Sequence, residues 1–264
     1  MNTKQTILIA LTMVCLSVIG YSSYMLWDIY SNRANQRTLH NHLLAYSPTR
    51  QLEHHQQPTN NNQSKTTQTL HQASFVNQSI VTLQARHPSV VGWLSIPNTW
   101  IDHPFVQSDN NDFYLHRDIT HNRAHAGTVF MDYRNSYNIS DFNTLIYGHN
   151  MNNGSMFAPI AEFECPDFFM ENRIGYLFLP YQTYEIEFIA FATIRPYDPI
   201  IYNPTISSLP EQLEFLEHVQ QVATNYHPVD LSTHPRLITL STCRNDSANS
   251  RLVLIGVLGP GLGW

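Results

Sequence analysis

A series of short apolar segments, each set off by turn-forming residues, constrains the fold of this chain more than any other feature of its sequence. Eight such segments follow residue 89, most of them bounded by Pro, Gly, Asn or Asp. They cover residues 90–96, 100–106, 127–132, 144–148, 173–179, 183–194, 237–242 and 251–258. Many short strands at this spacing are typical of a β-sandwich or a β-barrel. We therefore predict one mainly β domain.

Two local patterns add detail to this prediction. Apolar residues alternate along one predicted strand, and side chains two positions apart share one face of a strand; they are Tyr184, Ile186, Phe188, Ala190, Ala192 and Ile194. Ser208 and Glu211 have the spacing of a helix capping box. The residues that follow at helical spacing are Leu209, Leu213, Leu216 and Ala223. A helix is thus predicted before the last two strands.

The N-terminal region contains 21 consecutive uncharged residues, from position 7 to position 27. As a helix this segment would be roughly 31 Å long, close to the ~30 Å hydrocarbon core of a membrane. Tyr21, Tyr24 and Trp27 near its far end suit a membrane interface. A cleaved signal peptide ending near residue 20 is the alternative. We favour an uncleaved anchor, because the apolar run continues past that site.

The chain is therefore expected to have four parts. Residues 1–6 would form a short cytoplasmic N-terminus, 7–27 a transmembrane anchor, 28–86 a polar stalk with helical segments, and 87–264 the mainly β domain outside the cell. Within the stalk, residues 51–72 are rich in polar amino acids and are typical of a linker. The net charge is only -6 and no Lys/Arg-rich patch occurs, so nucleic-acid binding is not expected.

Cys243 is the candidate nucleophile. It follows the predicted strand 237–242 and precedes a polar loop, so it stands at the rim of the sheet, where loops build functional sites. A buried structural cysteine is the alternative interpretation. Cys165 lacks such a setting and Cys15 lies in the apolar N-terminal run. We interpret Cys165 and Cys243 as free thiols, since exported proteins that depend on disulfides usually contain more than one.

A catalytic thiol needs a proton-exchanging partner and a group that stabilises the oxyanion formed in acyl transfer. His149 follows the predicted strand 144–148 and precedes another polar loop, and Gly148 permits close approach of the backbone. Arg251 opens the last strand, eight positions after Cys243. If those two strands pair, Arg251 returns to the rim that carries the thiol. An ordinary surface arginine at a strand end is the alternative.

Three histidines crowd one polar loop: His116, His121 and His125. They suggest a metal site, but no Cys or carboxylate pattern completes a ligand set. We therefore expect neither a metal nor another cofactor.

These motifs together resemble the sortase family. Residues 239–243 read T-L-S-T-C, with an arginine on the next strand and I-Y-G-H-N-M upstream at 146–151. The segments V-G-W-L-S-I-P at 91–97, D-N-N-D-F-Y-L at 109–115 and A-G-T-V-F-M-D-Y-R-N at 126–135 match the family order. The stretch 148–157 and the helix before the cysteine strand are similar to class B sortases. The resemblance spans roughly residues 90–258.

The resemblance implies a closed eight-stranded β-barrel, with N-terminal helices, a helix inserted before the last two strands and one preceding transmembrane helix. It implies that Cys243 is the nucleophile, His149 the acid/base and Arg251 the stabiliser of substrate or oxyanion. The residues that would line the peptide groove by similarity to class B enzymes are Asn111, Leu115, Tyr147, Ser241 and Thr242. Asn245 and Asp246 stand where relatives carry an acidic residue after the cysteine, so the assistance of a carboxylate stays open.

The implied activity is that of a thiol-dependent transpeptidase on a Gram-positive cell surface. It would cleave a C-terminal sorting motif of a secreted protein, NPxTN-like rather than LPxTG-like, through a thioester. The acyl group would pass to an amine of peptidoglycan or of its lipid-linked precursor. The implied location is the cell membrane, with a single span and an extracellular domain.

Three alternatives stay open, and a fourth does not fit the sequence. The enzyme could polymerise pilins, or it could be a cysteine peptidase that releases the acid by hydrolysis. An L,D-transpeptidase would carry S-x-G-C-x-R, which Thr242 breaks by standing in place of the glycine. A non-enzymatic surface protein could use the histidine-rich loop to hold a metal.

Overall fold

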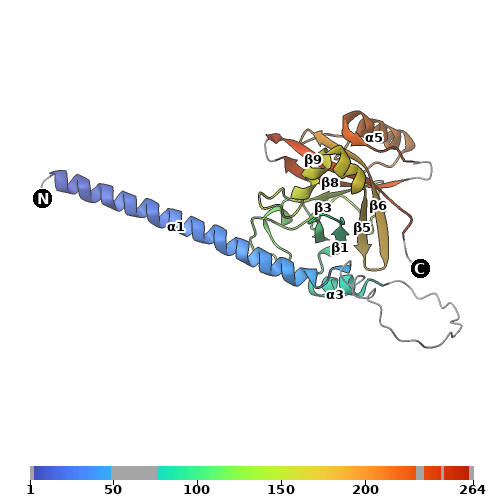
Figure 1. Ribbon diagram of the computed structural model, residues 1–264. Helices are drawn as coiled ribbons and strands as arrows, with labels where there is room; N and C mark the ends of the chain where they lie inside the picture. The colour runs from blue at the N-terminus through green and yellow to red at the C-terminus, as the bar shows by residue number, and fades with distance from the viewer. Residues whose placement is uncertain (1–2, 49–75, 230–234, 245–246, 262–264) are drawn as a thin grey trace. The chain divides into compact units, whose positions relative to one another are not determined.

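The computed structural model describes residues 3–48, 76–229, 235–244 and 247–261 (Figure 1). The chain divides into two compact units, Met1–His42 and Leu43–Trp264. The helix α1 spans Thr3–Leu44, and the first unit contains this helix as far as His42. Among the described residues, no helix combines the length and the hydropathy that crossing a membrane requires. The structure therefore gives no support to the predicted membrane segment 7–27. The predicted linker 51–72 lies outside the described residues.

The second unit contains a closed β-barrel, as predicted. Its eight strands are β1 (Val90–Ser95), β2 (Asp102–Val106), β3 (Phe130–Met131), β4 (Asn143–Tyr147), β5 (Ile174–Leu179), β6 (Gln182–Ile194), β8 (Arg236–Arg244) and β9 (Ser247–Leu258). They pair in the order β5-β1-β2-β3-β4-β8-β9-β6, and pairing of β5 with β6 closes the ring. Each overlaps one of the eight segments read from the sequence. The last two strands extend further toward each other than predicted, so Cys243 lies within β8, and Arg251 lies within β9 instead of opening it.

A ninth strand in the described chain, β7 (Ala223–Tyr226), was not predicted. It pairs with Ala190–Ala192 of β6. β5 pairs along the same edge of β6, at residues 182–187. The short run Ala-Thr-Asn-Tyr has no fully buried residue, so it lacks the apolar pattern that signals a strand. The inserted helix thus precedes β7 as well as the last two barrel strands.

The single face predicted for residues 184–194 is wrong beyond Phe188. A β-bulge shifts the register with β9 between Phe188 and Ala190, which leaves Ile189 as an extra residue. Before the bulge, Tyr184, Ile186 and Phe188 point into the core that fills the barrel. After it, the residues that join the second core, on the outer side, are Ala190, Ala192 and Ile194. One inserted residue exchanges the faces because side chains alternate strictly along a strand.

The helix α5 (Leu209–Val222) covers that second core and begins at the predicted capping box. The Ser208 side chain accepts a hydrogen bond from the Glu211 backbone, and the Glu211 carboxylate accepts one from the Ser208 backbone. The predicted apolar face is right only in part: Leu216 and Ala223 pack against the second core, and the other two predicted residues do not. The helix buries Phe215 and Val219, whereas Leu209 and Leu213 are 65% and 52% exposed.

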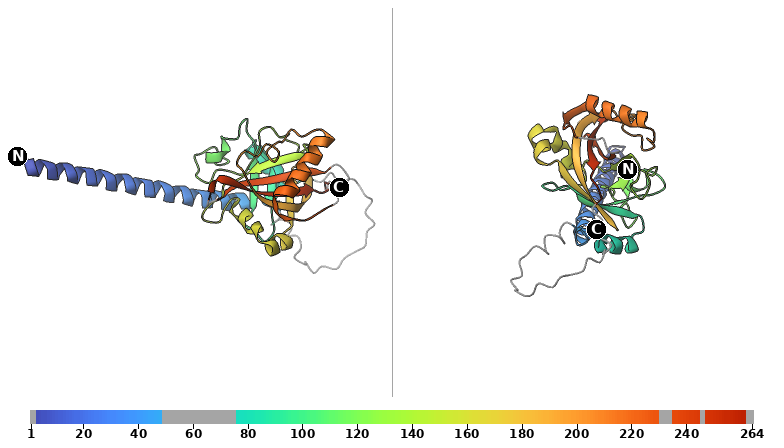
Figure 2. Two further views of the ribbon diagram at one scale, coloured as in Figure 1. Left: turned by 90° about the horizontal axis from the view of Figure 1, so that it is seen from above. Right: turned by 90° about the vertical axis from the view of Figure 1, so that its right-hand side faces the viewer.

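Shorter helices complete the unit: α3 (Gln78–Arg86), the 3-10 helices η1 (Tyr114–His116) and η2 (Ala158–Glu164), and α4 (Pro166–Glu171). Figure 2 shows α3 (cyan), the η2–α4 pair (yellow) and α5 (orange) on the outside of the barrel. Ile80 and Leu83 of α3 are fully buried. These helices leave the ends of β4, β8 and β9 to the loops that carry the candidate site.

Candidate active site

Three neighbouring strands bring the predicted catalytic residues to one rim of the barrel. β4 and β8 run parallel, with Tyr147 opposite Ser241, so His149 and Cys243 each stand two positions beyond that pair. β8 and β9 run antiparallel, with Cys243 directly opposite Arg251. The structure thus places all three residues at the same end of adjacent strands, as the sequence pattern predicts.

Two hydrogen bonds continue the β4–β8 pairing past the end of β4. The Gly148 amide donates to the Ser241 carbonyl at 3.1 Å, and the Asn150 side-chain amide donates to the Cys243 carbonyl at 2.9 Å. They fix the backbone of the histidine loop against the backbone of the cysteine strand. The Cys243 side chain itself is exposed, and Cys243 and Cys165 are both free thiols, as predicted.

His149 is held by one hydrogen bond and one ring contact. Its Nε2–H donates to the carbonyl oxygen of Leu115 at 2.7 Å, and since a carbonyl can only accept, Nε2 carries a proton. In the neutral ring Nδ1 is then the basic atom. Burial lowers the pKa of His149 below the ordinary 6.5, the Leu115 carbonyl opposes this shift, and nearby His116 adds to it. The His116 ring stacks on His149 with centroids 5.7 Å apart.

Gly148 lets the backbone of the histidine loop pass close to the Phe157 ring, where a side chain would clash. A Cβ at this position would lie 2.6 Å from the ring of Phe157, which is fully buried and cannot move aside. The close approach predicted for Gly148 is therefore confirmed. It allows the chain to turn from β4 directly into the loop that carries His149.

Arg251 and Cys243 share an unpredicted neighbour, Tyr202. Burial raises the pKa of Tyr202 to about 12; a hydrogen bond with Ser241 and the charge of Arg251 oppose the shift, while Cys243 reinforces it. The Tyr202 hydroxyl is 2.8 Å from the Ser241 hydroxyl, and its ring stacks on Tyr147 with centroids 6.2 Å apart. No sequence signal pointed to Tyr202, because it lies in the long β6–α5 connection.

The Tyr202 loop is tied to the body of the barrel at two points. Asp198 accepts hydrogen bonds from the backbone amides of Ile200 and Ile201 and from His218 of α5 at 2.9 Å. Arg134 donates from Nη2 to the Tyr202 carbonyl at 3.1 Å. The loop next to the thiol is thereby anchored to α5 on one side and to the β3–β4 connection on the other.

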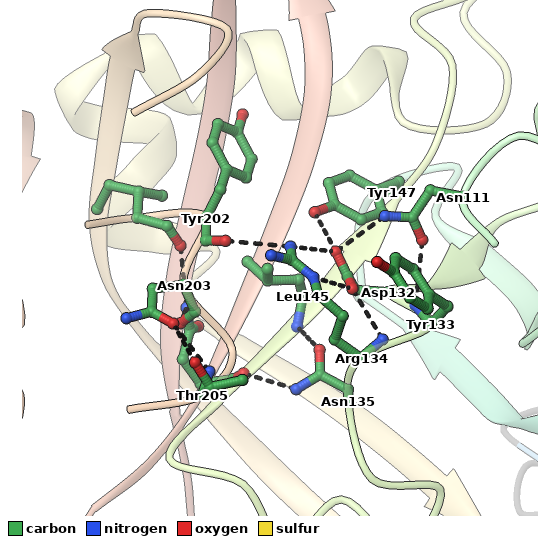
Figure 3. Close-up of polar contacts among 12 residues, drawn as sticks. Asn111, Asp132, Tyr133, Arg134, Asn135, Leu145, Tyr147, Tyr202, Asn203 and Thr205 are labelled. Atoms are coloured by element: carbon green, nitrogen blue, oxygen red, sulfur yellow. Dashed lines mark hydrogen bonds and ion pairs between the residues drawn. The ribbon is translucent and has the colours of Figure 1, made fainter. Parts of the chain in front are cut away.

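A buried carboxylate, Asp132, accepts hydrogen bonds from three side chains beside β4 (Figure 3). Asp132 and these three residues, Arg134, Tyr147 and Asn111, are called the Asp132 floor. The Asp132 side chain is fully buried and accepts two hydrogen bonds from the Arg134 guanidinium, both at 2.8 Å. Tyr147 donates its hydroxyl to the same carboxylate at 2.9 Å, and Asn111 donates its amide at 3.0 Å. Asp132 and Arg134 belong to the motif at 126–135, but the sequence did not predict that they would form this buried ion pair.

The residues predicted to line the peptide groove fall into two groups. Asn111 and Tyr147, in the Asp132 floor, and Leu115, next to His149, are half-buried. Ser241 and Thr242 are each only 3% exposed. The Ser241 hydroxyl pairs with Tyr202, and the buried Thr242 hydroxyl has no hydrogen-bond partner within the described residues. Contact of these five residues with a peptide stays a prediction.

Similarity to known proteins shows the family to which this chain belongs. No family model matches the sequence. Sortase B of Listeria monocytogenes is 33% identical over 255 residues, which is 94% of this chain and 95% of that protein. Sortase B of Bacillus anthracis has a solved structure with TM-score 0.63 and 32% identity, covering 69% of this chain and 85% of that one.

A Streptococcus pyogenes class B sortase involved in pilus biogenesis is also similar in structure. Its TM-score is 0.62 at 30% identity, and the match covers 68% of this chain and 97% of that one. The similarity in sequence extends over nearly the whole chain, and the similarity in structure covers the barrel that carries the cysteine, histidine and arginine. The chain therefore belongs to the class B sortases, a family of cysteine transpeptidases.

Proposed function

We propose that the chain cleaves a C-terminal sorting motif, NPxTN-like in preference to LPxTG-like, and joins the new carboxyl end to an amine of peptidoglycan or its lipid-linked precursor. The observation that carries the proposal is the register at the barrel rim, which sets Cys243 opposite Arg251 and level with His149. Nucleophile, acid/base and cation are the three groups that acyl transfer through a thioester needs.

Cys243 would give its thiol proton to Nδ1 of His149, and the thiolate sulfur would attack the carbonyl carbon of the scissile peptide bond and form a C–S bond. Arg251, always charged, would stabilise the oxyanion that develops on the carbonyl oxygen. As the C–N bond breaks, the leaving amine takes a proton from His149. Since Nε2 of His149 donates to the Leu115 carbonyl, the proton is exchanged at Nδ1.

The second half of the reaction reverses these roles. An acceptor amine attacks the thioester, a C–N bond forms, the C–S bond breaks, and His149 takes up the amine proton. The amine must compete with ~55 M water, so the site has to exclude water while it admits the nucleophile. The anchored Tyr202 loop and the Asp132 floor supply rigid walls for such a site.

The test is incubation with a sorting-motif peptide, with and without an amine acceptor. Mass spectrometry should detect the Cys243 thioester and, with acceptor, an amide product; Cys243→Ala should form neither, and Cys165→Ala should form both. If the wild-type enzyme released only the free acid at every acceptor concentration, it would be a hydrolytic peptidase and the transfer proposal would fail.

Polymerisation of pilins is a second candidate, favoured by the similarity to the Streptococcus pyogenes enzyme of pilus biogenesis. The two candidates differ in the acceptor, which is a lysine side chain of a protein in one and a wall-peptide amine in the other. Supplying both acceptors at equal concentration and comparing the product yields separates them.

We also propose that the enzyme works at the cell surface, anchored through residues 7–27. The support is the uncharged run of 21 residues. Cell fractionation of the full chain and of a chain lacking residues 1–42 tests this: the full chain should sediment with membranes and the shortened one should not. Equal distribution of both would overturn the anchoring.

A further inference from the structure

We propose that a cationic pocket beside His149, formed by His116, Arg123 and His125, binds a carboxylate carried by the amine acceptor. The inference rests on the proposed function and specifies its second substrate as an amine with a carboxylate a few bonds away. The pocket lies in the loop between β2 and β3, has a volume of about 230 Å³, and has Ala124 as its fourth lining residue.

Hydrogen bonds within the loop hold the pocket in shape. The Ala124 amide donates to the His116 carbonyl at 3.0 Å, and Ala124 is fully buried. Arg123 forms a β-bridge with Arg117, whose carbonyl accepts from Thr128 at 2.9 Å. The lining side chains are therefore presented by a closed turn.

The charge of the pocket favours an anion over a metal ion. A guanidinium is always positive and forms a planar fork that suits a carboxylate. Asp118, an acidic residue of the same loop, is 8% exposed, and its Oδ1 already accepts from Thr120 and Asn122. In the part of the chain that the structure describes, no three His, Cys, Asp or Glu residues cluster as metal ligands.

The position of the pocket points to the acceptor. The His116 ring, which lines the pocket, stacks on His149 at 5.7 Å and 26°. The incoming amine gives its proton to His149 and so must come within hydrogen-bond reach of it. A carboxylate attached near that amine can then enter the adjacent pocket. When the amine attacks, the C–N bond forms, Cys243 leaves as thiolate, and the proton moves to His149; the carboxylate stays unchanged.

Two acceptors that differ in one group test the inference in turnover. One is a diamino acid whose reacting amine has a carboxylate on the same carbon, and the other is its carboxamide. With a fixed donor peptide, the wild-type enzyme should have a KM about two- to fivefold lower for the carboxylate, from one charge-assisted hydrogen-bonded contact to exposed side chains. Arg123→Gln should abolish the difference through KM alone, with kcat and hydrolysis without acceptor unchanged.

Arg117→Gln is the matched control, because Arg117 lies in the same loop outside the pocket lining and should keep the preference. Equal use of both acceptors by the wild-type enzyme, or an unchanged preference in Arg123→Gln, would overturn the inference.

A binding experiment without turnover separates this inference from the proposed function. Histidine ring signals of the Cys243→Ala protein are followed by NMR during titration with each acceptor. The carboxylate should shift the His116 and His125 signals in the Arg117→Gln background and not in the Arg123→Gln background. Equal shifts with the carboxamide would contradict carboxylate binding, whatever the turnover shows. Failure of the wild-type enzyme to form a thioester would instead contradict the proposed function.

Discussion

At the scale of single residues, Asp132 shows how a buried charge is stabilised next to the candidate site. Burial alone would raise its pKa, but hydrogen bonds from Arg134, Asn111 and Tyr147 outweigh burial and hold the pKa below the ordinary 3.8. Such a carboxylate stabilises the fold above the unfolded pKa, and the contribution is lost as the pH falls through the folded pKa.

Asp132→Asn should therefore lower the free energy of unfolding at neutral pH by about 2 kcal/mol. This is less than for a fully buried pair, because the Arg134 side chain is 39% exposed and can regain water. The variant should also lose less stability than the wild type between pH 5 and pH 2. Urea denaturation across that range measures both effects. The exposed Asp112→Asn is the control and should change little; a neutral-pH stability of Asp132→Asn equal to the wild type would contradict this account.

Residue by residue, the sequence predicts what stands at the end of a strand and misses what depends on distant partners. Cys243, His149 and Arg251 each adjoin a strong apolar run, so strand pairing alone brings them together. Tyr202 and Asp132 could not be found this way. Their contacts join segments up to 68 residues apart, as in the Arg134–Tyr202 hydrogen bond, and no local pattern encodes them.

At the scale of elements, strand positions were predictable and faces were not. Alternation locates β6 but cannot reveal the bulge at Ile189, because the residues on both sides of the bulge are apolar. In α5, periodicity selected Leu213, whereas the fully buried residue is Phe215, whose ring makes an edge contact with Phe142 at 5.6 Å between centroids. Which face a helix buries depends on the sheet that it covers.

The pair Phe215 and Leu213 tests the observed face of α5. Phe215→Ala should cost about 3–5 kcal/mol, since it removes a fully buried ring and leaves a cavity. Leu213→Ala, on the exposed side, should cost less than about 0.5 kcal/mol. Urea denaturation with the linear extrapolation gives both values, and Phe215→Leu serves if the alanine variant does not fold. Comparable losses for the two alanine variants would contradict the placement of the helix.

At the scale of the whole molecule, the compact unit begins at Leu43, well before the boundary at residue 87 that the sequence suggested. Ser47 is fully buried, and its hydroxyl donates to the Asp102 carboxylate at 3.1 and 3.2 Å. The Arg86 guanidinium lies over the Tyr46 ring, 5.7 Å from its centroid. The segment 43–48 therefore contributes contacts to the barrel, although it lies far from β1 in sequence.

Two shortened proteins measure that contribution. Residues 43–264 should melt within about 2 °C of the full chain, because residues 1–42 form a compact unit of their own. Residues 76–264 keep α3 but lose the Ser47 and Tyr46 contacts, and should melt about 3–6 °C lower, which corresponds to roughly 1 kcal/mol. Ser47→Ala in the 43–264 protein should reproduce part of the loss, and Asp112→Asn, whose side chain is exposed, is the control and should change little. If the 76–264 protein melted with the full chain, the barrel would be independent of residues 43–48, and its folding unit would begin at α3.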